Sequence, residues 1–193
     1  MIMTPEIVTA ELRGMYRDVV RAADGQLLWD SQWQKNAIVF DCRRLLAAFV
    51  RGGAAGPPQP NVKPPAFGIR GIRVGSGSES WDETTSSASA ADKDLVDPRP
   101  YFLPREDIDF QIDFLDPATS AVTATATNKL QIVAKFGPGK PDWPKDQHLS
   151  STLREFGLVG QIEQTLVLIN YVRHPAIAKD PQSTLERTIW LTF

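Results

Sequence analysis

The chain has 193 residues, of which 42% are hydrophobic and 23% charged, as is ordinary for one sizeable globular domain. Its 21 basic and 23 acidic residues give a formal net charge of -2, which argues against the concentrated basic surface that nucleic-acid binding requires. No apolar run approaches the ~20 residues of a membrane span, and the single cysteine, Cys42, excludes an intramolecular disulfide and a cysteine-based zinc cluster.

The chain starts with a weakly patterned segment, residues 1–12, which predicts an N-terminal arm ahead of one domain over residues 13–193. This start has no basic stretch followed by an apolar run, so we expect no signal peptide and folding in a cytoplasm. From Met15 to Val39 the sequence predicts a β-hairpin, because Asp-Gly between β-prone runs favours a tight turn.

One helix is predicted, over residues 37–50. Its apolar residues recur at the spacing of a single helical face: Ile38, Cys42, Leu45, Leu46 and Phe49. This stripe indicates an amphipathic α-helix, for which Asn36 is the expected N-cap.

Two long loops are expected, at residues 51–65 and 76–100. The first is too rich in proline and glycine to be a helix or a central strand. The second is polar throughout, and a loop of that length is usually functional or disordered, so we expect it to become ordered against a partner. Residues 66–75 between them predict a strand whose internal glycine indicates a bulge or a close backbone contact.

The clearest alternation of apolar and polar residues lies in residues 101–114. We expect these side chains to face inward: Ile108, Phe110, Ile112 and Phe114. The acidic Asp107, Asp109 and Asp113 then lie on the outer face, too far apart along a strand to bind one calcium ion. We interpret them as a solvated face that is able to pair with basic residues of a partner. Residues 121–136 are the expected return strand.

Residues 165–193 are expected to anchor the fold. Residues 166–172 are apolar on both faces, as is typical of a central strand. In the last run one face carries Leu185, Arg187, Ile189, Leu191 and Phe193. We expect these two runs to form a hairpin across a loop with Pro175 and Pro181, preceded by a short strand or turn at residues 153–160. The fold class predicted is mainly β: an antiparallel β-sandwich with one amphipathic α-helix and long loops.

No stretch carries a catalytic or ligand-binding signature. His148 and His174 are the only histidines, and neither has a second ligand at metal spacing. The Gly-Ser-Gly-Ser run at residues 75–78 lacks the Gly-Lys-Ser/Thr of a phosphate loop, and no G-x-S-x-G elbow is present. We therefore expect no catalytic residue, no cofactor and no metal.

Three tryptophans are candidate partner contacts. Trp81 and Trp143 lie in predicted loops, and Trp190 lies on the polar side of the last strand. Aromatic residues at such positions favour contact with another surface. The alternative interpretation is packing beneath the chain's own loops. Because tryptophan also stacks on sugars, a carbohydrate-binding module stays open as well.

The order of several short motifs resembles that of small structural proteins of tailed bacteriophages and phage-tail-like particles. The motifs are LLWDSQWQKN, IVFDCRRLLAAFV, IRGIRVGSGS, REFGLVG and LINYVRHPAIAKDPQSTLERTIWLTF. In that group a W-x-x-N segment leads to an amphipathic helix and then to a strand that ends in a V-G-[ST]-G turn. The likeness covers most of the chain, and its departures are the proline-rich segment 52–65 and the long loop 79–100.

The resemblance implies a non-enzymatic virion structural protein: a tail, baseplate or fibre-attachment component. Its expected partners are other virion structural proteins, with several copies in each particle, and its expected location is the virion after assembly in the host cytoplasm. From the charge balance and the lack of a long apolar run, we expect no nucleic acid and no membrane as partner. The alternatives are a head-decoration or collar protein, a carbohydrate-binding β-sandwich module that recognises a surface glycan and, with less support, a hydrolase.

Overall fold

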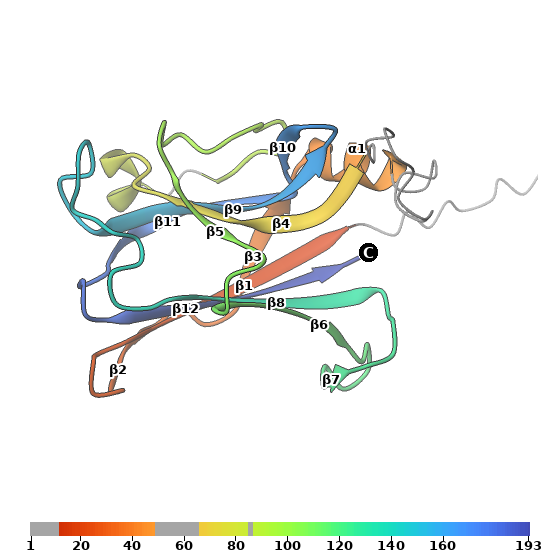
Figure 1. Ribbon diagram of the computed structural model, residues 1–193, viewed down its shortest axis with the longest axis horizontal. Helices are drawn as coiled ribbons and strands as arrows, with labels where there is room; N and C mark the ends of the chain where they lie inside the picture. Colours follow the sequence, from red (N-terminus) through yellow and green to blue (C-terminus); the bar gives the residue numbers. More distant parts are fainter. Residues whose placement is uncertain (1–11, 49–65, 85–86) are drawn as a thin grey trace, which may run out of the picture.

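The computed structural model describes residues 12–48, 66–84 and 87–193 (Figure 1). The chain is mainly β, as predicted, and its strands form one antiparallel curled sheet. The predicted arm, apart from its last residue, and the predicted loop 51–65 lie outside the described residues.

The elements follow in chain order. The strands are β1 (Arg13–Arg21), β2 (Leu27–Asp30), β3 (Gln34–Ile38), β4 (Ala66–Gly75), β5 (Tyr101–Pro104), β6 (Phe110–Leu115), β7 (Val122–Thr123), β8 (Lys129–Phe136), β9 (Thr152–Ile162), β10 (Thr165–Leu168), β11 (Asn170–Ala178) and β12 (Thr184–Thr192). The helices are α1 (Phe40–Ala48) and the 3-10 helix η2 (Glu79–Asp82).

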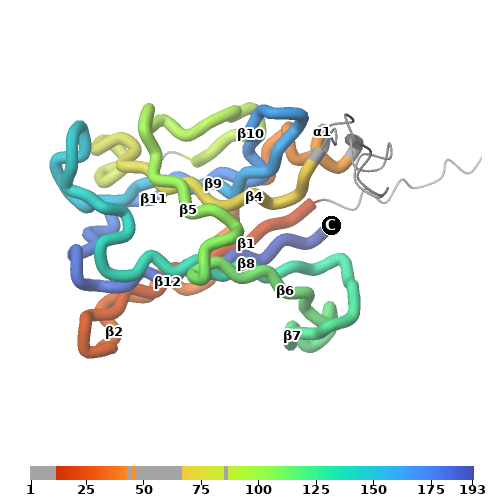
Figure 2. The backbone as a smooth tube through the Cα atoms, in the orientation of Figure 1, coloured from red at the N-terminus to blue at the C-terminus, as the bar shows by residue number. Residues whose placement is uncertain are grey.

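The strands pair in the order β5-β4-β9-β11-β3-β1-β12-β8-β6-β7, with β10 on β9 and β2 on β1. In Figure 1, β4, β9 and β11 lie above β12, β8 and β6, and the backbone trace of Figure 2 follows the same path. Strand β3 links these two halves, because it pairs with β11 through residues 37–38 and with β1 through residues 34–36. The sheet therefore curls back over itself.

The predicted C-terminal hairpin is wrong. Strand β11 pairs with β9 and β3, whereas β12 pairs with β1 and β8. The apolar run at residues 166–172 is divided between β10 and β11, and Pro175 lies within β11 rather than in the loop. The alternation of β12 is confirmed, because its inward residues Leu185, Arg187, Ile189 and Leu191 are all buried. Phe193 was predicted to share this face but is 37% exposed, because β12 ends at Thr192.

The structure confirms the predicted N-terminal hairpin but moves the start of the predicted helix. The hairpin is confirmed, since β1 and β2 pair antiparallel around a turn at Asp24-Gly25. The helix begins at Phe40, later than predicted, because residues 37–38 extend β3 and pair with β11. Asn36 is consequently a strand residue and not a helix cap.

Strand β9 is the longest and one of the most connected strands. The sequence predicted a short strand or turn at residues 153–160, but β9 runs for 11 residues and pairs with β4, β10 and β11. The bulge expected in β4 is confirmed by a register shift between Phe67 and Gly71. Gly71 has φ +155, and a Cβ atom there would lie 2.4 Å from the carbonyl oxygen of Leu103.

The hydrophobic core fills the space inside the curl. Fully buried members come from both halves of the sheet and include Ile72, Leu103, Phe136, Phe156, Leu158, Leu185 and Ile189. Ile108 was predicted to join them but is 94% exposed. The reason is that residues 105–109 form a turn, so that the alternation begins only at Phe110, the first residue of β6. The predicted return strand is interrupted: β7 and β8 both pair with β6, but residues 124–128 between them are not in a strand.

Candidate functional site

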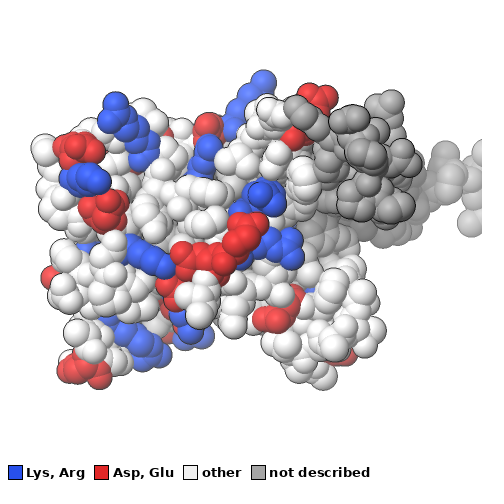
Figure 3. Space-filling model, in the orientation of Figure 1, with Lys and Arg blue, Asp and Glu red and all other residues white. Residues whose placement is uncertain are grey.

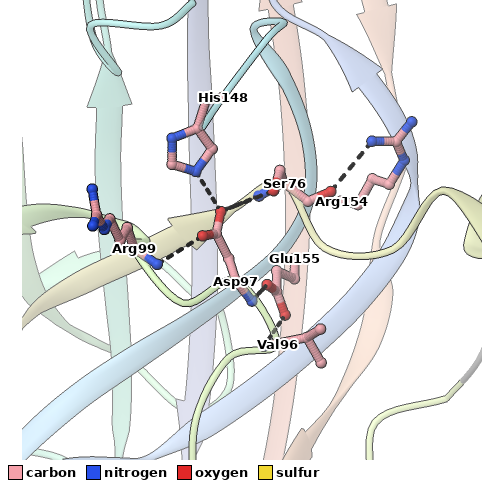
Figure 4. Close-up of polar contacts among 7 residues, drawn as sticks. All are labelled: Ser76, Val96, Asp97, Arg99, His148, Arg154 and Glu155. Atoms are coloured by element: carbon pink, nitrogen blue, oxygen red, sulfur yellow. Dashed lines mark hydrogen bonds and ion pairs between the residues drawn. The ribbon is translucent and has the colours of Figure 1, made fainter. Parts of the chain in front are cut away.

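A cluster of buried polar groups holds the 76–100 loop against β9 (Figure 4). Asp97 accepts hydrogen bonds from the backbone N–H of Ser76 at 2.8 Å and of Arg99 at 2.9 Å. His148 Nε2 lies 2.7 Å from the same carboxylate. Burial alone would raise the pKa of Asp97, but these hydrogen bonds hold it below its ordinary value.

Glu155 of β9 is the second acceptor in this cluster. Its fully buried carboxylate accepts the backbone N–H of Val96 at 2.9 Å and of Asp97 at 2.7 Å, as well as the hydroxyl of Tyr171. Burial and the carboxylate together raise the pKa of Tyr171 above its ordinary value. Backbone N–H groups of the loop thus donate hydrogen bonds to two buried carboxylates. These contacts within the chain hold the loop in place.

This cluster does not have the arrangement of a nucleophile and its base. Ser76 Oγ bonds to Asp97 at 3.0 Å, on the same oxygen that His148 contacts. A nucleophilic serine must instead lie within hydrogen-bond reach of the base. The imidazole is moreover stacked on Trp143, with ring centroids 3.7 Å apart. We therefore interpret the cluster as structural.

Trp81 and Trp143, two predicted partner contacts, are each only 7% exposed. Trp81 lies in η2 with the guanidinium of Arg173 5.2 Å from its ring centre. Trp143 stacks on His148, and its carbonyl oxygen accepts the hydroxyl of Ser151. Both rings are thus covered by this chain, as in the alternative interpretation of the sequence, and contact with a partner stays a prediction.

Trp190 and Asp113, two further predicted contacts, belong to one row across the outer face of the sheet. The backbone register pairs Trp190 of β12 with Gln131 of β8, and Gln131 with Asp113 of β6. The indole N–H of Trp190 donates to Gln131 at 3.0 Å, and the ring of Trp33 lies 4.2 Å away between centroids. The structure therefore brings these two predicted residues into one cross-strand row, with β8 between their strands.

Asp107 and Asp109 are not part of that row. They lie in the turn before β6, where Lys140 Nζ contacts Asp107 at 3.0 Å and Asp109 at 2.8 Å. The backbone N–H of Asp109 and then the lysine lower the pKa of Asp107, while the two carboxylates raise the pKa of Lys140. Acidic and basic side chains lie close together over much of the face shown in Figure 3. A basic residue of the chain itself, Lys140, thus pairs with both aspartates, and their contact with a partner protein stays a prediction.

The sequence predicted strand β2 as part of a hairpin but not the exposure of its apolar side chains. Leu27, Leu28 and Trp29 are 51%, 56% and 43% exposed. Among the described strands, β2 pairs only with β1, and in Figure 1 its hairpin extends away from the body of the molecule. The sequence did carry a signal for this exposure: three consecutive large apolar residues follow a tight turn. Successive side chains of a strand point to opposite faces, so a strand with one buried face cannot bury all three.

Within residues 12–48, 66–84 and 87–193, no group of three or more His, Cys, Asp or Glu residues could hold a metal ion. No helix of the described part is long and apolar enough to cross a membrane. Comparisons with protein-family models, curated proteins and solved structures found no match.

Proposed function

We propose that this chain is a non-enzymatic structural protein of a tailed-phage particle, a tail, baseplate or fibre-attachment component, which assembles through strand β2. The observation that carries the proposal is the run of apolar side chains left exposed on an edge strand. Protein chains rarely leave such an edge open, because its unpaired backbone groups and apolar side chains invite pairing with another chain.

The chemistry of β2 favours a polypeptide partner. Alternate backbone N–H and C=O groups of β2 face away from β1, as in any edge strand. A strand added there gains main-chain hydrogen bonds, and the exposed leucines and Trp29 supply apolar area worth roughly 25 cal/mol for each Å² buried. The ion pair between Arg17 and Asp30 fixes the end of β2 against β1, so the edge is held ready for pairing.

We also infer that the curled sheet acts as an antiparallel β-sandwich with α1 as an amphipathic helix at one end. Support for the sandwich comes from the core between the halves, where Phe156 of β9 and Ile189 of β12 are both fully buried. Support for the amphipathic helix comes from buried Cys42 and Leu45 beside the exposed Phe40. A rigid scaffold of this kind suits a protein that works by binding.

The assembly step is tested by sedimentation of the full chain over a range of concentrations. We expect the wild type to self-associate or to bind a co-expressed particle protein, and Leu28→Lys to abolish that association without lowering the thermal midpoint. Leu149→Lys is the matched control, since Leu149 is 91% exposed but lies outside the strands. Equal association of Leu28→Lys and wild type would reject β2 as the contact.

The particle itself is tested by mass spectrometry of phage-like particles purified from induced cultures of the strain that carries the gene. The expected result is several copies of this chain in each particle. Imaging of the same particles distinguishes a tail or baseplate position from the head-decoration or collar alternative. A chain found only outside the particles would contradict the proposal.

A further inference from the structure

An apolar cavity of about 370 Å³ lies between the two halves of the curled sheet, where α1 and β4 face β6, β8 and β12. Its described wall is almost wholly apolar and includes Leu45, Ile69, Ile112, Leu130, Leu191 and Phe193. A cavity of roughly 150 Å³ accommodates one benzene molecule, so this one has room for two or three large apolar side chains. Apolar cavities at the mouth of a curled sheet are common binding sites.

The chain enters the described structure at the mouth of this cavity. Arg13, the first residue of β1, pairs with Thr192, and the residue that follows, Phe193, belongs to the cavity wall. Figure 1 accordingly shows the C-terminus beside the start of β1. The residues ahead of Leu12 span up to about 36 Å when extended, which is enough to reach a neighbouring molecule.

These residues, segment 1–11, have a composition that suits the cavity. Met1, Ile2 and Met3 are consecutive apolar residues, and methionine adapts its shape to irregular apolar spaces. The charged side chains of the segment are Glu6 and Glu11, and both are acidic. An apolar group followed by an acid is therefore available to a cavity that has a cation at its rim.

The wall supplies such a cation. Arg105 lines the cavity and is exposed, and its guanidinium has no hydrogen bond or ion pair within residues 12–48, 66–84 and 87–193. The other charged residue of the described wall is Asp113, which belongs to the row on the outer face of the sheet. A glutamate at the rim thus gains a counter-charge from Arg105 without displacing an existing ion pair.

We propose that the cavity binds residues 1–8 of a second copy of this chain, with Met1 to Met3 inside it and Glu6 near Arg105. Traced backward, β1 leads out of the sheet beside Phe193. A segment that entered its own cavity would have to reverse direction at once, whereas a neighbouring copy is reached without a reversal. Each copy then offers one segment and one cavity, so that contacts run head to tail.

The contact is small, and we therefore expect it to be weak between free molecules, with a Kd on the order of 0.1–1 mM. It becomes filled where another contact, such as the one through β2, already holds copies together. The insertion itself does not depend on the proposed function.

The test uses full chains that all carry Leu28→Lys, so that association through β2 is absent. The segment variant adds Ile2→Asp and Met3→Asp. The cavity variant adds Phe193→Asp, which places a carboxylate in the apolar wall at a residue outside the strands.

The reporters are the methyl resonances of Ile112, Leu130 and Leu191 in the cavity wall. In the chain with an intact segment and cavity, they should shift as the concentration rises to ~1 mM. Each variant alone should show no such shift. Adding unlabelled cavity variant to labelled segment variant should restore the shift, because one intact segment then meets one intact cavity. The reverse labelling should give no shift.

Two further variants make the result specific. Ile108→Asp is the matched control, since Ile108 is 94% exposed and is not among the described wall residues, and it should leave the shifts unchanged. Arg105→Gln should raise the Kd about threefold or more. If Phe193→Asp lowers the thermal midpoint, Leu46→Asp on the α1 side of the wall takes its place.

Three outcomes would overturn the proposal. Cavity resonances that differ between the intact chain and the segment variant but do not change on dilution would assign the segment to its own cavity. A shift produced by dodecanoate but not by the cavity variant would assign the cavity to an amphiphile. The third outcome is a mixture that gives no shift. Sedimentation at lower concentrations, where this contact is largely empty, still reports association through β2, so the two contacts can fail separately.

Discussion

Arg187 and Asp18 form a bidentate ion pair in the core, with Nε 2.6 Å from Oδ1 and the second nitrogen 2.7 Å from Oδ2. Both side chains are fully buried, and the two residues are register partners on β12 and β1. The guanidinium lies 3.7 Å from the ring centre of Phe156 on β9, and His174 of β11 is 3.3 Å away. This one cation therefore connects both halves of the curled sheet.

Removing one partner of this pair should be costly. We expect Arg187→Met to lower the free energy of unfolding by about 3–5 kcal/mol, because the carboxylate of Asp18 is left buried without a counter-charge. Urea denaturation measures the loss. Combining Arg187→Met with Asp18→Leu should restore much of it, since no buried charge then remains.

The neighbouring residue provides the control for this prediction. Glu186 pairs with Lys135 on the outer face, where the two side chains are 42% and 48% exposed. Exposed pairs contribute ~1 kcal/mol or less, so Glu186→Gln should leave the denaturation midpoint nearly unchanged. Similar losses for Glu186→Gln and Arg187→Met would contradict the special role of the buried pair.

Stability should depend on pH through His174. Burial, followed by the charge of Arg187, lowers the pKa of this histidine from 6.5 to about 4. Between these values the unfolded chain binds a proton that the folded chain does not, so stability falls as the pH falls from about 6.5 towards 4. The full loss is on the order of 3 kcal/mol, at ~1.4 kcal/mol for each pKa unit.

Urea denaturation at a series of pH values measures this loss, and His174→Gln should remove most of the slope in that window. The amide of glutamine offers an acceptor to Arg187, whose second nitrogen lies 3.3 Å from His174 Nε2 in the wild type. A slope that persists unchanged in His174→Gln would assign the effect to other groups.

The sequence allowed the local elements to be predicted better than their partners. The alternation in β12 correctly placed Arg187 on the inward face, and Asp-Gly correctly placed the β1–β2 turn. Strand pairing, in contrast, depends on contacts between distant segments, which explains why the predicted C-terminal hairpin was wrong. Strand β9 was underestimated because its two glycines resemble turn residues, although they allow close packing.

The sequence predicted the positions of some partner-contact residues correctly but missed the buried polar cluster. Trp190 and Asp113 were chosen from alternation alone, which places them correctly on the outer face of their strands. Asn36, in contrast, was wrongly predicted to cap the helix. The pairing with β11 that extends β3 beyond this residue is not visible in the sequence. The buried carboxylates Asp97 and Glu155 could not be recognised, since one lies in a polar loop and the other in a run expected to be a short strand or turn.

Asp97 should control the order of the 76–100 loop. We expect Asp97→Ala to cost about 1–3 kcal/mol of stability, because it leaves the backbone N–H groups of Ser76 and Arg99 without their acceptor. Hydrogen exchange should then increase in residues 76–84 and 87–100 more than in β12. Asp94→Ala is the control, since Asp94 is 62% exposed and pairs with Arg73 at the surface. Equal protection of the loop in wild type and Asp97→Ala would contradict the interpretation.

Gly157 of β9 should not tolerate a side chain. A Cβ atom there would lie 2.6 Å from Leu168 Cδ2 and 2.8 Å from the carbonyl oxygen of Asn170, and backbone cannot move aside cheaply. Overpacking of this kind typically costs ~1–3 kcal/mol, so Gly157→Ala should lower the denaturation midpoint by a corresponding amount. Gly137→Ala is the matched control, because nothing lies within 4 Å of its added Cβ, and its effect should stay within about 0.5 kcal/mol. If both variants were equally stable, the close contact between β9 and the β10–β11 junction would be wrong.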